Sequence, residues 1–172
     1  GGEVVLGVSP SSLSPVEPRR GEVERVTGVS HACGLPEHIV ERQAEAVRER
    51  LRELGVPVDM EKIHVEKAPS KGTAVTVVGH AGSRIGGSAL GERGKPAEEV
   101  GREAAEGLVE DVHTGGDVDR YVADQLVPYV GRAGGSYEAP RVTSHLGTNV
   151  EVVSEFCDAS LDGTRVVGTQ DS

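Results

Sequence analysis

The chain of 172 residues contains no tryptophan, a single phenylalanine and three tyrosines. Its hydrophobic core must therefore be built from Val, Leu, Ile and Ala, since apolar residues still make up 36% of the sequence. The two cysteines, Cys33 and Cys157, form no CxxC pair, so the sequence predicts neither a disulfide framework nor a four-ligand zinc site.

Long apolar runs are also missing. No stretch approaches about 18 consecutive apolar residues, so we expect no transmembrane helix. The first residues lack the basic segment and the apolar run of a signal peptide. We therefore expect a cytoplasmic protein whose thiols are reduced.

The formal net charge of -10 argues against nucleic-acid binding, because phosphate contacts come mainly from Lys and Arg. However, Arg outnumbers Lys, Glu outnumbers Asp, and Asn149 is the single asparagine. Such a composition is typical of proteins from hot or salty cytosol. The net charge therefore indicates habitat more than ligand, and local clusters of arginine are more informative.

The first half of the chain alternates between strand and helix patterns. "EVVLGV" predicts a first strand, and a Ser- and Pro-rich linker follows it. The expected elements after the linker are a strand in "EVERVTGVS", a helix from Pro36 to Gly55, and strands in "VDMEKIHVEK" and "TAVTVVGHA". Residues 20–81 thus form a small βαββ unit, which could be a self-contained insert.

In the second half, Pro96 begins a helix with acidic residues in its first turn. Asp117 is expected to cap the next helix, which Pro128 should end or kink. A strand in "SYEAPRVTS", a helix in "HLGTNVEVVSEF" and a strand in "TRVVGT" complete an α/β order in which helices pack on sheets.

His145 is the histidine with the most informative surroundings. It follows a predicted strand and precedes a predicted helix, where backbone N–H groups can hold a phosphate. A neutral imidazole at that place could attack phosphorus. The alternative is a histidine that only caps or ends a loop, and the other five histidines are scattered without metal-ligand spacing.

Tyr121, Asp124 and Gln125 are a second candidate group. Their i, i+3, i+4 spacing places them on one helix side, opposite the apolar side. The ring could stack on a base, and the acid and the amide could form hydrogen bonds with it. A polar strip that only faces solvent has the same pattern. The Gly-rich "GSRIGGS" and "GERGKPAEE" could cradle phosphate, although neither matches a known phosphate-loop pattern.

Taken in order, several stretches resemble the C-terminal half of an RNA 3'-terminal phosphate cyclase. They are "GGEV", "RGEVERVTGVSHACGLPEHIVERQ", "GSALGERGKPAEEVG", "GGDVDRYVADQLVPYVGRAGGS" and "TSHLGTNVEVVSEF". The combination of "GERGKPAEEVG", "YVADQL" and "SHLGTN" is specific to that family. The resemblance implies an α/β (α+β) fold of βαβαββ-type modules, similar to enolpyruvylshikimate phosphate synthase. Residues 1–19 and 82–172 would belong to the catalytic domain, and residues 20–81 to the insert.

The resemblance also implies an activity. The family converts an RNA 3'-phosphate end into a 2',3'-cyclic phosphate with ATP and a divalent metal, Mg or Mn. A histidine is adenylated, AMP passes to the RNA 3'-phosphate, and the vicinal 2'-hydroxyl displaces AMP. His145 matches the adenylated residue, Tyr121 the residue that stacks on adenine, and Asp124 and Gln125 residues near the nucleotide. The metal ligands in this chain stay unknown.

Family members are roughly twice as long, so we expect a C-terminal fragment whose partner is the missing N-terminal half. That half would supply the metal-binding acid and most basic groups for phosphate and RNA. Two alternatives stay open. One is a non-catalytic relative in ribosome biogenesis, which would lack the nucleophilic histidine, and the other is an inactive fragment.

Overall fold

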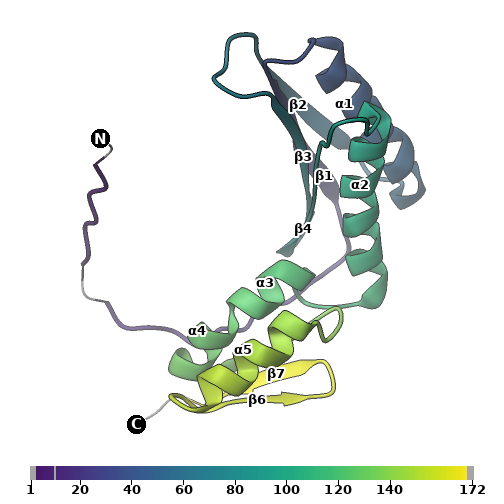
Figure 1. Ribbon diagram of the computed structural model, residues 1–172. Helices are drawn as coiled ribbons and strands as arrows, with labels where there is room; N and C mark the ends of the chain where they lie inside the picture. The colour runs from purple at the N-terminus through teal and green to yellow at the C-terminus, as the bar shows by residue number, and fades with distance from the viewer. Residues whose placement is uncertain (1–2, 10, 170–172) are drawn as a thin grey trace.

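The protein is built from two β-sheets, each with helices on one face (Figure 1). The structure is a computed structural model and describes residues 3–9 and 11–169. The first sheet has four strands in the order β2-β1-β3-β4, and the second has three in the order β5-β7-β6. Strands and helices thus mix along the chain, which confirms the predicted fold class.

The four-stranded sheet contains the predicted βαββ elements. Its strands are β1 (Arg25–Cys33), β2 (Val58–Val65), β3 (Gly72–Ala81) and β4 (Ser83–Leu90). β1 pairs with β2 in parallel and with β3 antiparallel, and β3 pairs with β4 through a tight hairpin. "GSRIGGS" therefore forms part of a strand, so its interpretation as a phosphate-binding turn was wrong.

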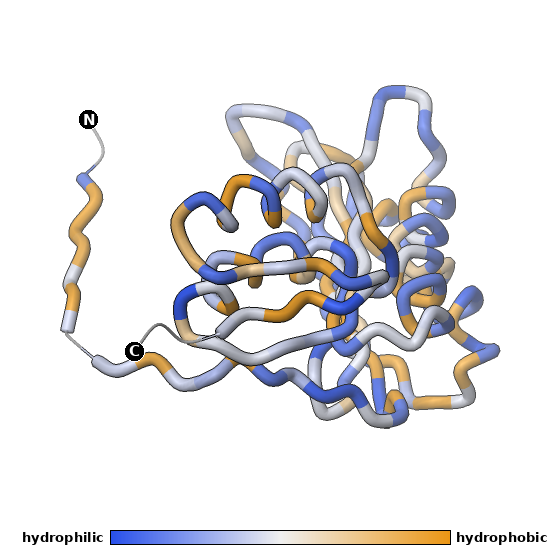
Figure 2. Tube along the Cα trace, turned by 90° about the horizontal axis from the view of Figure 1, so that it is seen from below, coloured by the Kyte–Doolittle hydropathy of each residue, from blue (hydrophilic) through white to orange (hydrophobic). Residues whose placement is uncertain are grey.

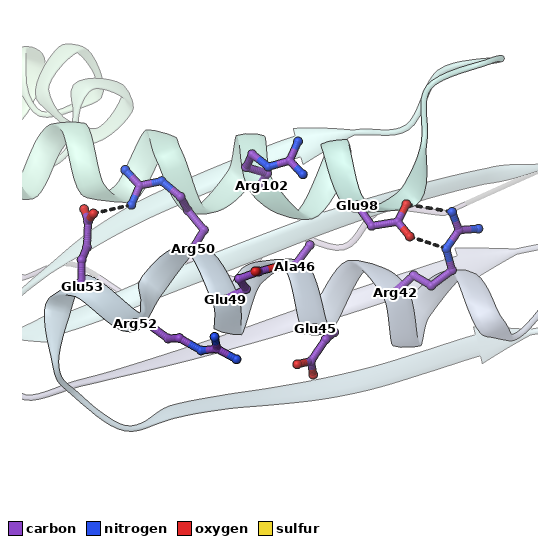
Figure 3. Close-up of a pocket in the computed structure, with 9 residues that line it drawn as sticks. All are labelled: Arg42, Glu45, Ala46, Glu49, Arg50, Arg52, Glu53, Glu98 and Arg102. Carbon is purple, nitrogen blue, oxygen red and sulfur yellow. Dashed lines mark hydrogen bonds and ion pairs between the residues drawn. The ribbon is translucent and has the colours of Figure 1, made fainter.

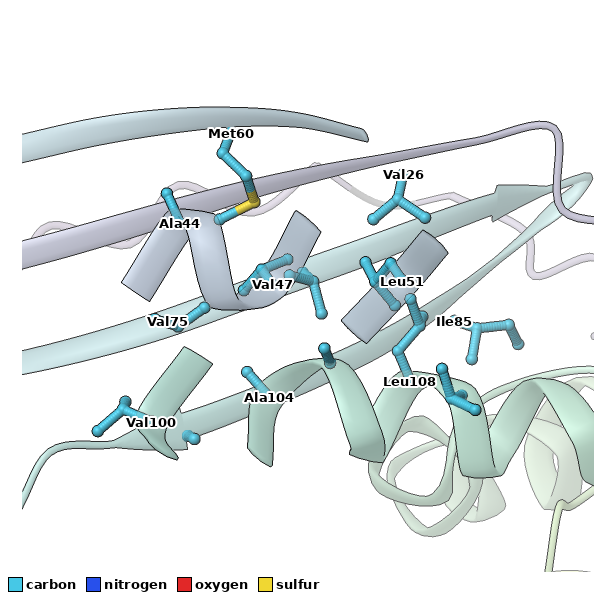
Figure 4. Close-up of a cluster of buried hydrophobic side chains, with 14 residues drawn as sticks. Val26, Ala44, Val47, Leu51, Met60, Val75, Ile85, Val100, Ala104 and Leu108 are labelled. Atoms are coloured by element: carbon cyan, nitrogen blue, oxygen red, sulfur yellow. The ribbon is translucent and has the colours of Figure 1, made fainter. Parts of the chain in front are cut away.

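Two helices cover one face of this sheet: α1 (His38–Arg50), which continues into a short 3-10 turn (Leu51–Leu54), and α2 (Ala97–Thr114). The helices approach closely because Gly101 has no side chain there, and a Cβ atom would lie 2.3 Å from the carbonyl oxygen of Gln43. The core between helices and sheet is entirely aliphatic apart from Met60, as the composition requires (Figure 4).

The second unit follows α2. It contains α3 (Arg120–Gln125), α4 (Val127–Ala133), β5 (Gly135–Glu138), α5 (Ser144–Ser154), β6 (Ala159–Asp162) and β7 (Arg165–Gly168). The buried ring of Tyr137 is the largest side chain of its core, and Leu146 and Val166 pack in the same cluster. The sequence pattern predicted one helix, ended or kinked by Pro128, where the structure has α3 and α4, and it did not predict β6.

The strand predicted in "EVVLGV" was wrong. Residues 3–9 form no strand and extend away from the rest of the molecule, although much of the segment is hydrophobic (Figure 2). Val4 is 95% exposed, and the other large apolar side chains of the segment are similarly exposed. The reason is that a strand needs a neighbour to receive its backbone hydrogen bonds, and none is present in the described chain.

The division of the chain at residue 81 stays a prediction. In the structure, residue 81 ends β3, and the next strand, β4, pairs with β3 in the same sheet. The side chains of Ile85, Leu108 and Val109 from β4 and α2 contribute to the same core as β1 and α1.

Candidate functional site

Helix α3 begins against the edge of the four-stranded sheet. The carboxylate of Asp119 caps the helix, since Oδ1 accepts hydrogen bonds from the N–H groups of Tyr121 (2.9 Å) and Val122 (2.8 Å). Its Oδ2 accepts a third, from the N–H of Gly86 in β4, at 2.8 Å. The buried Asp119 thus fixes the start of α3 on β4.

The predicted cap at Asp117 was therefore wrong by two residues. Oδ2 of Asp117 instead accepts from the N–H of Glu138 in β5 at 2.9 Å, which ties the loop before α3 to the second sheet. Both aspartates precede an apolar-periodic run, and local sequence does not tell which one adopts the capping geometry.

A buried ion pair holds the first residue of α3. The guanidinium of Arg120 contacts the carboxylate of Asp111, in the last turn of α2, with Nη2 to Oδ1 at 2.6 Å and Nε to Oδ2 at 3.0 Å. The hydrogen bond to Asp111 is the main cause that raises the pKa of Arg120. Since the side chain of Asp111 is only 1% exposed, α2 and α3 are joined by a charge pair that water hardly reaches.

The three predicted residues of α3 lie on its outer side. Tyr121 is 55% exposed, Gln125 is exposed and Asp124 is half-buried. The opposite side places Ala123 in the core of the second unit, and Val127 continues that contact in α4. The predicted orientation of the helix is thus confirmed, and its ring, amide and acid face outward together.

Pro128 interrupts the helix after α3. An α-helix would pair the carbonyl of Asp124 with the N–H of residue 128, and proline has no N–H to give. The side-chain Nδ2 of Asn149, in α5, donates to that carbonyl at 3.0 Å instead. α3 and α5 are therefore joined at the end of the turn that carries Tyr121, Asp124 and Gln125.

His145 lies in the first turn of α5. Thr143 caps this helix, because its Oγ1 accepts from the N–H of Leu146 at 3.0 Å. The N–H groups of Ser144 and His145 have no partner inside the helix, and the imidazole of His145 is exposed. Asn149 follows His145 by four residues, so the two side chains lie on the same side of α5. His145 is therefore placed on the side of α5 that contacts α3.

A buried side chain in the interior of the second unit holds the middle of α3. The hydroxyl of Tyr137, in β5, donates to the carbonyl of Ala123 in α3. Burial raises the pKa of Tyr137, and the nearby carboxylate of Asp124 raises that pKa further. Tyr137 therefore stays protonated and serves as a donor that fixes the middle of α3.

A groove away from these residues lies between α1 and α2 (Figure 3). It has a volume of about 600 Å³, and ion pairs cross it. One is bidentate, from Nε and Nη2 of Arg42 to the two carboxylate oxygens of Glu98 at 2.6 and 2.8 Å. Its arginines and glutamates largely neutralise one another, which is typical of a solvated contact between helices.

Metal ligands do not gather in the part of the chain that the structure describes. Within residues 3–9 and 11–169, no three His, Cys, Asp or Glu side chains are close enough to hold an ion. Over the same residues, no helix is both long and apolar enough to cross a bilayer.

Known proteins resemble this chain over most of its length. Residues 18–113 match the model of the family described as RNA 3'-terminal phosphate cyclase (RTC), insert domain. The RNA 3'-terminal phosphate cyclases of Pyrococcus furiosus and Thermococcus kodakarensis are 42% and 44% identical over 160 residues, which is 91% of this chain and 46% of each relative. The corresponding protein of Thermococcus onnurineus is 42% identical over 177 residues, 98% of this chain and 51% of that protein. The chain spans about half the length of the curated relatives that it matches.

Proposed function

The chain belongs to the RNA 3'-terminal phosphate cyclase family, and from this premise we propose that it forms one part of an ATP-dependent enzyme. That enzyme converts an RNA 3'-terminal phosphate into a 2',3'-cyclic phosphate. His145 becomes adenylated, and Tyr121, Asp124 and Gln125 hold the nucleotide.

The bond between Asn149 and Asp124 carries this proposal. This bond joins α5, which carries the proposed nucleophile, to α3, which carries the proposed nucleotide contacts. Its acceptor is a carbonyl that has no helical donor because residue 128 is a proline. Two candidate groups that are separated by about twenty residues of sequence thus lie on packed helices. Such packing supports a common site, because a nucleophile must be held about 3–3.5 Å from its target and in the correct orientation.

In the first step, a neutral imidazole nitrogen of His145 attacks the α-phosphorus of ATP, a P–N bond forms, and pyrophosphate leaves. The exposed position of His145 allows this attack, and the free N–H groups at the start of α5 can stabilise charge on the phosphate oxygens. A positively charged histidine could not attack, since its nitrogen lone pair would hold a proton.

In the second step, an oxygen of the RNA 3'-phosphate displaces His145 and takes the AMP. The neighbouring 2'-hydroxyl then attacks the 3'-phosphorus, loses its proton and expels AMP, which closes the ring. This last step needs mainly a fixed geometry, because the nucleophile is already attached beside its target.

On α3, the exposed ring of Tyr121 has the position and the flat surface for stacking on adenine. The amide of Gln125 and the carboxylate of Asp124 lie on the same side and can accept or donate hydrogen bonds to the nucleotide. A divalent ion, Mg or Mn, would help to neutralise the phosphates.

The proposal includes a partner, namely the remainder of the enzyme, since the relatives are about twice as long as the stretch that they share with this chain. That remainder would complete the metal and phosphate contacts. A cytoplasmic location is part of the same proposal.

The test is transfer of label from α-labelled ATP to the protein. The chain is incubated with Mg or Mn, with and without an N-terminal half taken from a relative, and acid-labile, base-stable label on protein is measured. We expect label on the reconstituted pair and none on its His145→Ala variant. Label that persists in His145→Ala contradicts the role of this histidine. A reconstituted pair without label favours the non-catalytic relative.

A further inference from the structure

The four-stranded sheet has an open face. α1 and α2 both lie on its other face, where Val26 and Ile85 join the core (Figure 1). Side chains alternate between the two faces of a strand, so the sequence neighbours of these core residues point to the open side. A Cβ atom at Gly79 would contact Leu108 of α2, which places His80 on the open side as well. The open face therefore carries three basic side chains at one end: Arg25, His80 and Arg84.

These three residues form a row across β1, β3 and β4. Arg25 is paired with His80 in the sheet register, and His80 is paired with Arg84. Adjacent strands are about 4.8 Å apart, so the row is about 10 Å wide at the backbone. Arg25 and Arg84 are exposed, and neither forms a salt bridge with any carboxylate that the structure describes. The row therefore presents uncompensated positive charge, which is unusual for a chain with a net charge of -10.

His80 is held in the middle of the row. Its Nε2 lies 2.8 Å from the hydroxyl Oγ1 of Thr27, the next open-face residue of β1. Burial, then Arg25 and then Arg84 lower the pKa of His80. The charged groups that lower the pKa of His80 are thus Arg25 and Arg84, so the positive charge of the row comes from its two arginines.

Two acids of the same face lie on the β2 side. Asp59 and Glu61 of β2 are opposite Thr27 and Val29 and line a shallow cavity of about 350 Å³. They would repel an anion from the β2 side of the sheet. At the β4 side, a Cβ atom at Gly86 would lie 3.2 Å from Oδ2 of Asp119, but this carboxylate already accepts three backbone hydrogen bonds. The row is therefore flanked by two acids on the β2 side and by a carboxylate with three backbone donors at the start of α3.

We propose that the row of Arg25, His80 and Arg84 binds the phosphodiester backbone of the RNA strand, upstream of its 3' end. Guanidinium groups match phosphate oxygens with two parallel hydrogen bonds, and two arginines across a sheet suit an extended polyanion better than a single small ion. The row ends beside the helix that carries Tyr121, so a strand lying on it continues toward the proposed active site. This inference rests on the proposed function, because that function names RNA as the substrate.

The same face indicates that the contact ignores base identity. The tyrosines and the phenylalanine all lie outside the four strands, so a base on this face could stack only on a histidine ring such as that of His80. Stacking tolerates every base, and contacts with backbone phosphates position a strand without selecting its sequence.

The experiment measures binding of a 5'-labelled single-stranded RNA to the 172-residue chain by fluorescence anisotropy, without ATP, over a series of salt concentrations. We expect the double variant Arg25→Gln/Arg84→Gln to bind roughly tenfold more weakly or worse, and to reduce the slope of log K against log salt by about 0.7 per arginine. The control double variant Arg52→Gln/Arg93→Gln changes the net charge equally but lies off this face, and it should bind as the unaltered chain does. The row variant should lose the same factor of affinity for RNA that ends in a 3'-phosphate and for RNA that ends in a 3'-hydroxyl.

Three results would overturn the inference: an unaltered chain that does not bind RNA, a control variant as weak as the row variant, or a row variant that loses affinity for ATP and not for RNA. The outcome is independent of adenylation, because the binding is measured without ATP and no adenylate can form. A failure of the RNA contact is thus separable from a failure of the proposed chemistry.

Discussion

The side-chain amide of Asn149 donates a hydrogen bond to the backbone carbonyl of Asp124, at 3.0 Å. This carbonyl lacks its usual helical partner because residue 128 is a proline. The only asparagine of the chain therefore replaces a missing backbone donor and joins α5 to α3 at the proposed site.

Asn149→Ala should lower the free energy of unfolding by about 1 kcal/mol, since the half-buried carbonyl of Asp124 then lacks a protein donor. In a Pro128→Ala background the penalty should shrink, because residue 128 regains an N–H. A double-mutant cycle by urea denaturation measures both effects. Equal penalties in the two backgrounds would contradict this account of the bond.

Arg120→Met should destabilise the chain by about 3 kcal/mol, because it leaves the buried carboxylate of Asp111 without its charge partner. Arg48→Met is the matched control. Its pair with Glu45 is exposed and 3.8 Å long, so its loss should cost less than about 0.5 kcal/mol. Denaturant titrations compare the two, and similar costs would show that Asp111 is better solvated than its burial indicates.

Two glycines of α2 should respond to alanine in opposite directions. A Cβ atom at Gly101 would lie 2.3 Å from the carbonyl oxygen of Gln43, so Gly101→Ala should lower stability by more than about 1 kcal/mol. At Gly107 the nearest atom is 3.8 Å away, and Gly107→Ala should raise stability by about 0.5–1 kcal/mol through helix propensity. Thermal unfolding monitored by circular dichroism measures the stability of both variants. A stabilising Gly101→Ala would disprove the close approach of α1 and α2.

Stability should fall as the pH drops below about 6.5, in part because of His80. Burial and then the two arginines lower its pKa in the folded state, so the unfolded chain binds a proton more readily. The stabilising contribution is therefore complete above the unfolded pKa and is lost as the pH falls through the folded pKa. His80→Gln keeps a partner for Thr27 and should flatten this part of the pH profile of unfolding. An unchanged profile would mean that His80 is solvated as in the unfolded chain.

Tyr121→Ala should weaken ATP binding by the reconstituted enzyme and leave the stability of the chain unchanged, because the ring is 55% exposed and packs on no core. Tyr129→Ala is a matched control, since that ring is 58% exposed on the neighbouring helix α4. Isothermal titration calorimetry gives both affinities. If Tyr129→Ala weakens ATP binding as much as Tyr121→Ala, the loss reflects a general surface effect and the stacking role is disproved.

The sequence predicted most elements because their signals are local. Apolar periodicity placed both long helices, and the spacing of Tyr121, Asp124 and Gln125 predicted that they share the outer side of α3. The predictions failed where a partner decides the conformation. "EVVLGV" has strand propensity but no neighbouring strand among the described residues, and "GSRIGGS" has turn composition but pairs with β3.

Some contacts around the site could not be predicted from local sequence alone. Asp119 and Asp117 are both typical capping residues, and only the packing of α3 on β4 separates them. A free carbonyl at Asp124 could have been predicted from Pro128, which follows it by four residues. That Asn149 would donate to it depends on how α5 packs.

The family, the class of fold and the outward helix faces follow from the amino-acid sequence, because motif order and side-chain periodicity are properties of the chain. Which residues meet depends on the packing of distant segments. In the row, Arg25 is more than fifty residues away in sequence from His80 and Arg84, and only the register of the three strands places them side by side. Likewise, only the packing of α5 on α3 brings Asn149 to Asp124, because long-range contacts follow from the burial of two apolar faces against each other and not from any local pattern.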